Sequence, residues 1–166
     1  KVTAFKLLER YRKVLPSFND DIQGTAAVAV AGMMAGVRVS GIPLRDQRVV
    51  ILGAGAAGVG IARLVRTALI TAGMPAARAR ERIAVLDSQG LVVDDAPLDA
   101  HKQEFAWTAQ MAVGHGLAKG SKRDLETVVR VMKPTVLIGT SGEPGTFTEG
   151  VIRAMGEAVS RPVIFP

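Results

Sequence analysis

The chain has 166 residues, about the length of one domain, and 48% of them are hydrophobic and 22% charged. This is the composition of an ordinary globular protein and excludes a disordered chain. No cysteine is present, so disulfide scaffolds, thiolate nucleophiles and zinc–thiolate sites are excluded together. The longest apolar stretch, 25–37, is short for a bilayer span, and no charged-then-apolar leader opens the chain. We therefore expect a cytoplasmic protein with no membrane partner.

Basic residues outnumber acidic ones by 21 to 15, which leaves a formal charge of +6. Such an excess would suit a polyanionic partner. However, the positive charges are spread along the chain, and the only aromatic residues are one Trp, one Tyr and five Phe. Nucleic-acid surfaces need aromatic stacking platforms or a presented basic element. We expect a solvated basic surface and no nucleic-acid partner, and keep a basic nucleic-acid-binding module only as a minor alternative.

The first part of the chain has the periodicity of two helices. Residues 4–13 carry apolar positions at helical spacing. Residues 25–37 are small and apolar on every side, which predicts a helix buried all round. Asn19, Asp20 and Asp21 directly precede this second helix and are suited to cap it and to meet its dipole.

Four short apolar runs predict strands, and segments with helical patterns lie between them. This alternation predicts βαβ units, hence a protein of the α/β class. We expect a Rossmann-like, doubly wound, mostly parallel sheet with helices on both faces. The arginines of residues 74–82 are expected in an extended loop. The predicted strands are 48–52, 82–86, 135–138 and 162–165, and the predicted helices after the first strand are 61–73, 100–108, 125–132 and 147–159.

A glycine pattern follows the first predicted strand and opens a helix. Gly53, Gly55 and Gly58 match G-x-G-x-x-G, with Ala56 and Ala57 between the last two. The first glycine permits a tight turn, the second lets a pyrophosphate approach the backbone, and the third lets helix and strand pack closely. These five residues are predicted to bind a dinucleotide at the helix N-terminus. The alternative is a purely structural turn, because the chain has 18 glycines.

Asp87 stands at the end of the second predicted strand, 29 residues after Gly58. A carboxylate at this position accepts hydrogen bonds from ribose hydroxyls and repels a 2′-phosphate, so NAD is favoured. The neighbouring Ser88, with Lys102 further along the chain, leaves NADP open. The alternative for Asp87 is an ordinary turn residue at a strand end.

The pair Asp20 and Asp21 allows two interpretations. Adjacent carboxylates before a helix can simply cap it. Alternatively, one holds a hard divalent cation and the other orients a proton-transfer group, since oxygen ligands suit Mg or Mn. Two ligands do not make a site, and the sequence offers no obvious third.

The motifs taken together resemble one known family. In their order along the chain they are similar to the nucleotide-binding domain of malic enzyme, and FNDDIQGT is the most specific of them. The resemblance covers almost the whole chain except about residues 94–121. The matching segments are FNDDIQGTAAV (18–28), RVVILGAGAAGVGIA (48–62), LDSQGLV (86–92), KPTVLIGTSG (133–142), FTEGVIRAM (147–155) and RPVIFP (161–166).

The resemblance implies oxidative decarboxylation of L-malate to pyruvate and CO2 with NAD or NADP and with Mg or Mn. It implies that Asp21 is a metal ligand and that Asp20 pairs with a catalytic lysine. It also places the turn of Gly139, Thr140 and Ser141 beside the nicotinamide. The family generally forms dimers or larger assemblies, so a homo-oligomer is expected.

Several of the family's residues have no counterpart here. In the family, a Glu-Asp metal pair precedes the segment that begins at Lys1, a lysine and a tyrosine lie in an earlier domain, and an asparagine follows the last strand. Residues 1–166 are therefore expected to be an excised NAD(P)-binding domain that binds cofactor weakly and does not turn over malate alone. Two alternatives stay open: a domain of a malolactic enzyme, and a non-catalytic dinucleotide-sensing domain.

Four further residues have expected roles outside the chemistry. His101 and His115 are interpreted as surface or loop residues, and Trp107 and Tyr11 as packing residues.

Overall fold

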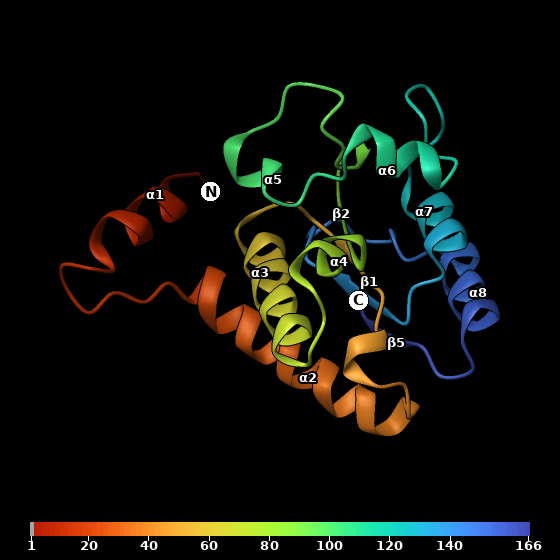
Figure 1. Ribbon diagram of the computed structural model, residues 1–166, viewed down its shortest axis with the longest axis horizontal. Coiled ribbons are helices and arrows are strands. Elements are labelled where there is room, and N and C mark those ends of the chain that lie inside the picture. The colour runs from red at the N-terminus through yellow and green to blue at the C-terminus, as the bar shows by residue number, and fades with distance from the viewer. Residues whose placement is uncertain (1) are drawn as a thin grey trace.

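A five-stranded sheet forms the centre of the molecule in the computed structural model, which describes residues 2–166 (Figure 1). The strand order is β3-β2-β1-β4-β5, with β1 parallel to both β2 and β4, and β4 parallel to β5. Only the short β3 is antiparallel. The four predicted strands are confirmed, whereas the two-residue β3 was not predicted. The strands are β1 (Val49–Leu52), β2 (Ile83–Asp87), β3 (Gly90–Leu91), β4 (Val136–Gly139) and β5 (Val163–Phe165).

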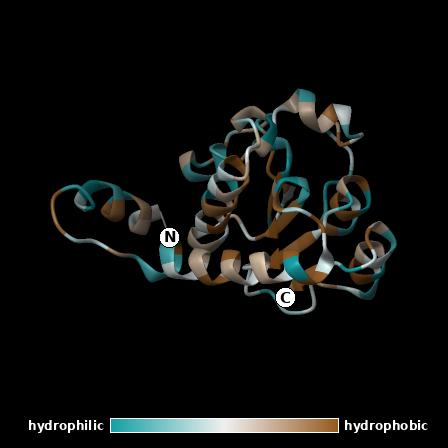
Figure 2. Cartoon of the chain, turned by 60° about the horizontal axis from the view of Figure 1, so that its bottom comes forward, coloured by the Kyte–Doolittle hydropathy of each residue, from teal (hydrophilic) through white to brown (hydrophobic). Residues whose placement is uncertain are grey.

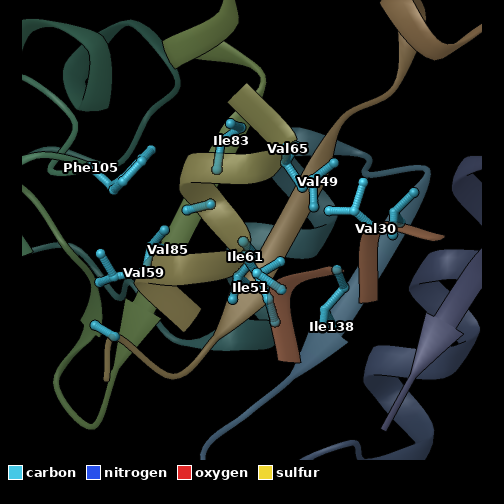
Figure 3. Close-up of a cluster of buried hydrophobic side chains, with 14 of the residues drawn as sticks. Val30, Val49, Ile51, Val59, Ile61, Val65, Ile83, Val85, Phe105 and Ile138 are labelled. Atoms are coloured by element: carbon cyan, nitrogen blue, oxygen red, sulfur yellow. The ribbon is translucent and has the colours of Figure 1, made fainter. Parts of the chain in front are cut away.

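Helices cover both faces of the sheet, which confirms the predicted doubly wound fold. Alternate residues of each strand enter two separate cores: Val49 and Ile51 enter one, Val50 and Leu52 the other. Figure 3 shows the first core, with strand residues packed against α3 and α2. Figure 2 shows the strands as the most hydrophobic part of the interior. The first core is covered by α2 (Thr25–Ser40), α3 (Ala56–Thr71) and α4 (Ala76–Glu81), and the second by α7 (Leu125–Met132) and α8 (Glu149–Ala158).

The second predicted helix is longer than its apolar pattern. A π-helical turn, η1 (Asp20–Gly24), runs into α2, and together they make a helix of 21 residues that ends at Ser40, with Gly41 as its C-cap at φ of +73°. By length and composition alone this helix is able to cross a membrane. Here it lies against the sheet, with Gly32 and Gly36 in contact with the side chains of β5.

The prediction that this helix is buried all round is wrong. Ala26, Val30 and Met33 lie in the first core, but the side chains of Val28 and Val39 are 76% and 68% exposed. The reason is geometric: a helix laid on one face of a sheet contacts it along one stripe only. The helix therefore carries more apolar side chains than the described part of the domain buries.

Helix α1 (Val2–Tyr11) is confirmed and lies at the edge of the molecule (Figure 1). The predicted loop 74–82 is instead mostly helix α4. The sequence AARARE contains strong helix formers and follows Pro75, and the buried Ala79 fastens it to the core. A single predicted helix at 100–108 is replaced by two short ones. The two helices are α5 (Ala100–Gln103) and α6 (Ala109–Gly114). Elsewhere in the chain, a 3-10 turn, η2 (Leu44–Asp46), precedes β1.

Candidate functional site

The glycine turn joins β1 to α3 and can be built only with glycine at two positions. Gly53 has φ of +119°, a conformation that L side chains rarely adopt. A Cβ on Gly58 would overlap the carbonyl oxygen of Gly53, so α3 could not start this close to the strand. Gly55 caps α3 without a side chain. The N–H groups of the first helical turn therefore lack intrahelical partners and form a place for an anion.

A cavity of about 660 Å³ lies at the carboxyl ends of β1, β2 and β4. Its size suits a small-molecule cofactor, and it lies where strand order reverses between β1 and β4, the usual ligand position in open α/β sheets. The structure brings together six of the residues predicted from sequence. These are Gly53, Gly55, Asp87, Ser88, Thr140 and Ser141.

The remaining predicted cofactor residues lie next to this cavity and do not line it. Ala56, Ala57 and Gly58 form the first turn of α3. Gly139 lines a neighbouring hollow of about 520 Å³, which shares Thr140 and Ser141 with the main cavity. Both groups border the space in which a dinucleotide is predicted to lie.

Thr140 connects the end of β4 to the glycine turn. Its N–H donates to the carbonyl of Leu52 at 2.7 Å, and its hydroxyl lies 3.1 Å and 3.2 Å from the carbonyls of Leu52 and Gly53. A Cβ on Gly53 would overlap this hydroxyl. Thr140 thus holds the two loops at one wall of the cavity in a fixed relation.

Both carboxylate oxygens of Asp87 are occupied. Oδ1 accepts the N–H of Gln89 at 2.8 Å, which is a local turn contact. Oδ2 accepts from Nζ of Lys102 at 2.7 Å, and the two side chains are only 16% and 25% exposed. Asp87 is therefore a turn residue and also part of the cavity wall, where it lies beside the ammonium group of Lys102.

The acidic pair is not needed to cap its helix. Oδ1 of Asn19 accepts the N–H of Ile22 at 3.0 Å, and Oε1 of Gln23 accepts the N–H of Asn19 at 3.0 Å. This is a reciprocal arrangement like that of a capping box, with the glutamine one position further along the helix. Asp20 and Asp21 are both exposed and leave the capping to Asn19.

The segment that carries the acidic pair packs against α3, the helix that the glycine turn opens. The carbonyl of Ile22 lies against Gly60 of α3 so closely that a Cβ would overlap it. Asp20 and Asp21 do not line the 660 Å³ cavity. Within residues 2–166, no three Asp, Glu, His or Cys side chains come together in a way that could hold a metal ion. The part of the chain that the structure describes thus presents two carboxylates and not a complete metal site.

The loop that leads into α5 is fastened by an ion pair. The guanidinium of Arg123 meets the carboxylate of Asp95 through two bonds of 2.7 Å and 3.2 Å. The hydrogen bonds from Arg123 hold the pKa of Asp95 below its ordinary value, although its own desolvation opposes them. This pair keeps the wall of the cavity that carries Asp99 close to the sheet.

Comparison with known proteins gives the same assignment as the motifs. Residues 22–166 match the family described as "Malic enzyme, NAD binding domain". The chain belongs to this family. The NAD-dependent malic enzyme of Shewanella denitrificans is 44% identical over 164 residues, which cover 98% of this chain and 29% of that protein. The malolactic enzyme of Lactiplantibacillus plantarum is 39% identical, again over 29% of its length.

A solved structure supports the family assignment. The malic enzyme of Entamoeba histolytica superposes with a TM-score of 0.70 at 27% identity, covering 96% of this chain and 30% of that one. The malic enzyme NAD-binding domain described here therefore spans 29 to 30% of the length of these relatives.

Sequence reasoning missed one wall of the cavity in this NAD-binding domain. Helix α5 brings His101 and Lys102 into the cavity. His101 is half-buried and stands in α5, so it is not a loop residue, although it does lie at the surface of the cavity. The signal was weak because α5 has four residues and lies in the least patterned part of the chain.

The other expectations for isolated residues are mixed. His115 is exposed at the end of α6, as expected, with its ring 4.9 Å from that of Trp107. Trp107 is fully buried and donates its indole N–H to the carbonyl of Ile83 at 2.8 Å, so it is a packing residue. Tyr11 is 38% exposed and is not part of the core.

Proposed function

We propose that this domain belongs to an enzyme that oxidatively decarboxylates L-malate to pyruvate and CO2 while reducing NAD. The single observation that carries the proposal is the cavity at the sheet switch point, where the glycine turn, Asp87 and the β4 turn meet. The exposed FNDDIQGT carboxylates lie in η1, the turn that packs against Gly60 of α3, and they supply the second half of the argument. We also propose a cytoplasmic homo-oligomer.

The residues of the cavity divide the work of binding the dinucleotide. The first-turn N–H groups of α3 would hold the pyrophosphate, because they are unpaired and at the positive end of the helix dipole. Asp87 would accept hydrogen bonds from the adenosine ribose. Thr140 and Ser141 would border the nicotinamide, which accepts a hydride from C2 of malate when NAD is bound.

Asp20 and Asp21 are the right type of ligand for a hard cation, but two side chains are too few to complete its coordination shell. Carboxylate oxygens are the ligands that Mg and Mn prefer. Two carboxylates leave most of the coordination shell to other groups. We propose Asp21 as one ligand, with the others supplied by parts of the enzyme outside residues 2–166. A bound divalent cation stabilises negative charge on the substrate oxygens. Asp20 would hold a lysine ammonium in position for proton transfer.

The test uses the full-length polypeptide that carries this domain. We expect malate-dependent formation of pyruvate and NADH that requires Mg or Mn. Asp21→Ala should lower kcat by at least about 100-fold, because removal of a metal ligand removes Lewis-acid stabilisation. It should leave NAD affinity within about twofold of the unsubstituted protein, since Asp21 does not line the cavity.

Asp46→Ala is the matched control, because Asp46 is also exposed but precedes β1, at the amino ends of the parallel strands and away from the cavity. It should keep full activity. Unchanged activity of Asp21→Ala would remove Asp21 from the metal site, whereas NAD binding without any malate oxidation by the unsubstituted protein would support a non-catalytic dinucleotide-sensing domain.

A malolactic enzyme is the second candidate, favoured by the relative from Lactiplantibacillus plantarum. Such an enzyme would convert malate to lactate without net release of NADH. Following NADH at 340 nm while measuring lactate and pyruvate in the same reaction separates the two. Lactate without NADH would replace the first proposal.

A further inference from the structure

Helix α5 is too short to hold its own position. It has four residues, and Asp99 at its N-cap makes no side-chain capping bond. Isolated helices of this length are unstable in water. Its place must therefore come from tertiary contacts, and those contacts decide where His101 and Lys102 stand in the cavity wall.

Ion pairs fasten the C-terminal end of α5 to the body of the domain. Lys102 pairs with Asp87 of β2 at 2.7 Å. Just beyond the helix, Glu104 accepts from Arg63 and Arg66 of α3 at 2.7 Å and 2.8 Å. None of these ion pairs involves the ring of His101.

A contact to the ring of His101 comes from α1. The ring of Phe5 stacks on the ring of His101, with centroids 5.5 Å apart and planes 24° from parallel. The guanidinium carbon of Arg63 lies 5.2 Å from the centroid of the same Phe5 ring. Phe5 also packs against the first core, whereas Leu7 of the same helix is 50% exposed. Phe5 is thus the residue that joins α1 to both α3 and α5.

We propose that Phe5 is a positioning residue for dinucleotide binding: it acts through His101 to hold α5 against the adenosine side of the cavity. Phe5 itself does not line the cavity. The inference rests on the proposed function, because the adenosine side is identified by Asp87, to which α5 is bonded. The nicotinamide side is the turn after β4, whereas the ring contacts of Phe5 are with His101 of α5 and Arg63 of α3.

The experiment measures binding of the two halves of the cofactor by calorimetry in the full-length protein. AMP probes the adenosine side and nicotinamide mononucleotide probes the other. Phe5→Ala should weaken AMP binding by about 3- to 10-fold, the scale of one aromatic stack and one cation–π contact. Binding of nicotinamide mononucleotide should stay within about twofold.

Two variants control for the helix and for the ring. Leu7→Ala alters an exposed side chain of the same helix and should leave AMP binding unchanged. Phe5→Tyr keeps the aromatic face and should restore binding. In a His101→Ala background, Phe5→Ala should add less than about twofold, because its effect passes through the imidazole.

Three outcomes would overturn the inference. They are AMP affinity unchanged in Phe5→Ala, equal loss for both half-cofactors, and a full additional loss in the His101→Ala background. Lower thermal stability of Phe5→Ala with normal AMP binding belongs to the first of these and makes Phe5 purely structural. Failure of the unsubstituted protein to bind NAD would be a different result, since it overturns the proposed function and this inference with it.

Discussion

At the scale of single residues, we expect two side chains, Asp87 and Lys102, to influence the choice between NAD and NADP. Their 2.7 Å contact places a carboxylate and an ammonium side by side in the cavity wall. The carboxylate suits free ribose hydroxyls, and the ammonium suits a 2′-phosphate. We therefore expect the relative affinity for the two dinucleotides to depend on which member of the pair a ligand engages.

Substituting each partner should move the two affinities in opposite directions. Asp87→Ala should weaken NAD binding by roughly 10- to 100-fold, the value of hydrogen bonds to a charged group, and spare NADP because Lys102 is released. Lys102→Ala should weaken NADP and spare NAD. Fluorescence titration with NADH and NADPH measures both affinities, with the exposed Lys6→Ala as control. If Asp87→Ala binds both dinucleotides normally, Asp87 has no place in the ribose site.

Gly58 makes a prediction about stability that is separate from binding. Because a Cβ there meets the backbone of Gly53, Gly58→Ala should lower the free energy of unfolding by about 1–3 kcal/mol, the usual cost of overpacking, and should also weaken NAD binding. Gly156→Ala is the matched control. It lies in α8, is exposed, and has open space at its Cβ position, so it should stabilise by about 0.5–1 kcal/mol. Urea unfolding measures both, and a neutral Gly58→Ala would contradict the packing argument.

At the scale of elements, helix α7 depends on a charged N-cap. Oδ1 of Asp124 accepts the N–H of Thr127 at 3.0 Å, and Oδ2 meets Nζ of Lys122 at 2.6 Å. Burial raises the pKa of Asp124, but hydrogen bonds from Lys122 and Thr127 outweigh it and lower the pKa to about 2. A carboxyl whose pKa is lower in the folded than in the unfolded protein stabilises the fold at pH values above its unfolded-state pKa. That contribution is lost as the pH falls through its folded-state pKa.

The Asp124 cap should therefore be sensitive to pH between about 4 and 2. Asp124→Ala should cost about 0.5–2 kcal/mol of unfolding free energy at pH 7, and this cost should shrink as pH approaches 2. Thr148→Ala at the N-cap of α8 is the control, because the hydroxyl of Thr148 accepts the N–H of Val151 without a charge. Its cost should not change with pH. Equal pH dependence of the two variants in urea titrations would refute the role of the Asp124 charge.

Elements were predictable where the local pattern agreed with the tertiary contacts. Strands such as 135–138 are short β-branched runs that end at turn residues, and α7 was predicted with the bounds that it has. Helix α4 was missed because Pro75 and the arginines suggested a loop, while buried Ala79 supplies the contact that makes it helical. Helix α5 was predicted to begin at the right residue but to be too long, and its place in the cavity wall was not predictable because it depends on Phe5, Asp87 and α3, none of which is near it in sequence.

At the scale of the whole molecule, the described residues 2–166 form a cavity at the sheet switch point and present two exposed carboxylates, which we propose as part of a metal site. We predict that the 166-residue chain alone binds NAD but does not oxidise malate with or without Mn. The physical reason is that Asp20 and Asp21 lack a third ligating side chain among the described residues. Calorimetry with NAD and an NADH assay with malate test the two halves of the prediction. Metal-dependent oxidation of malate by this chain would contradict it.

The sequence by itself determined the α/β class, the alternation of strands and helices, the glycine turn and the family. These follow from local patterns: β-branched runs, glycines where φ is positive or packing is close, and the motif FNDDIQGT. Only the tertiary structure decided that α2 is half exposed, that Asn19 and not the aspartates caps it, and that α5 closes one wall of the cavity. Those outcomes depend on which surfaces meet across the fold, and contacts between segments as distant as Phe5 and His101 leave no periodic trace in the chain.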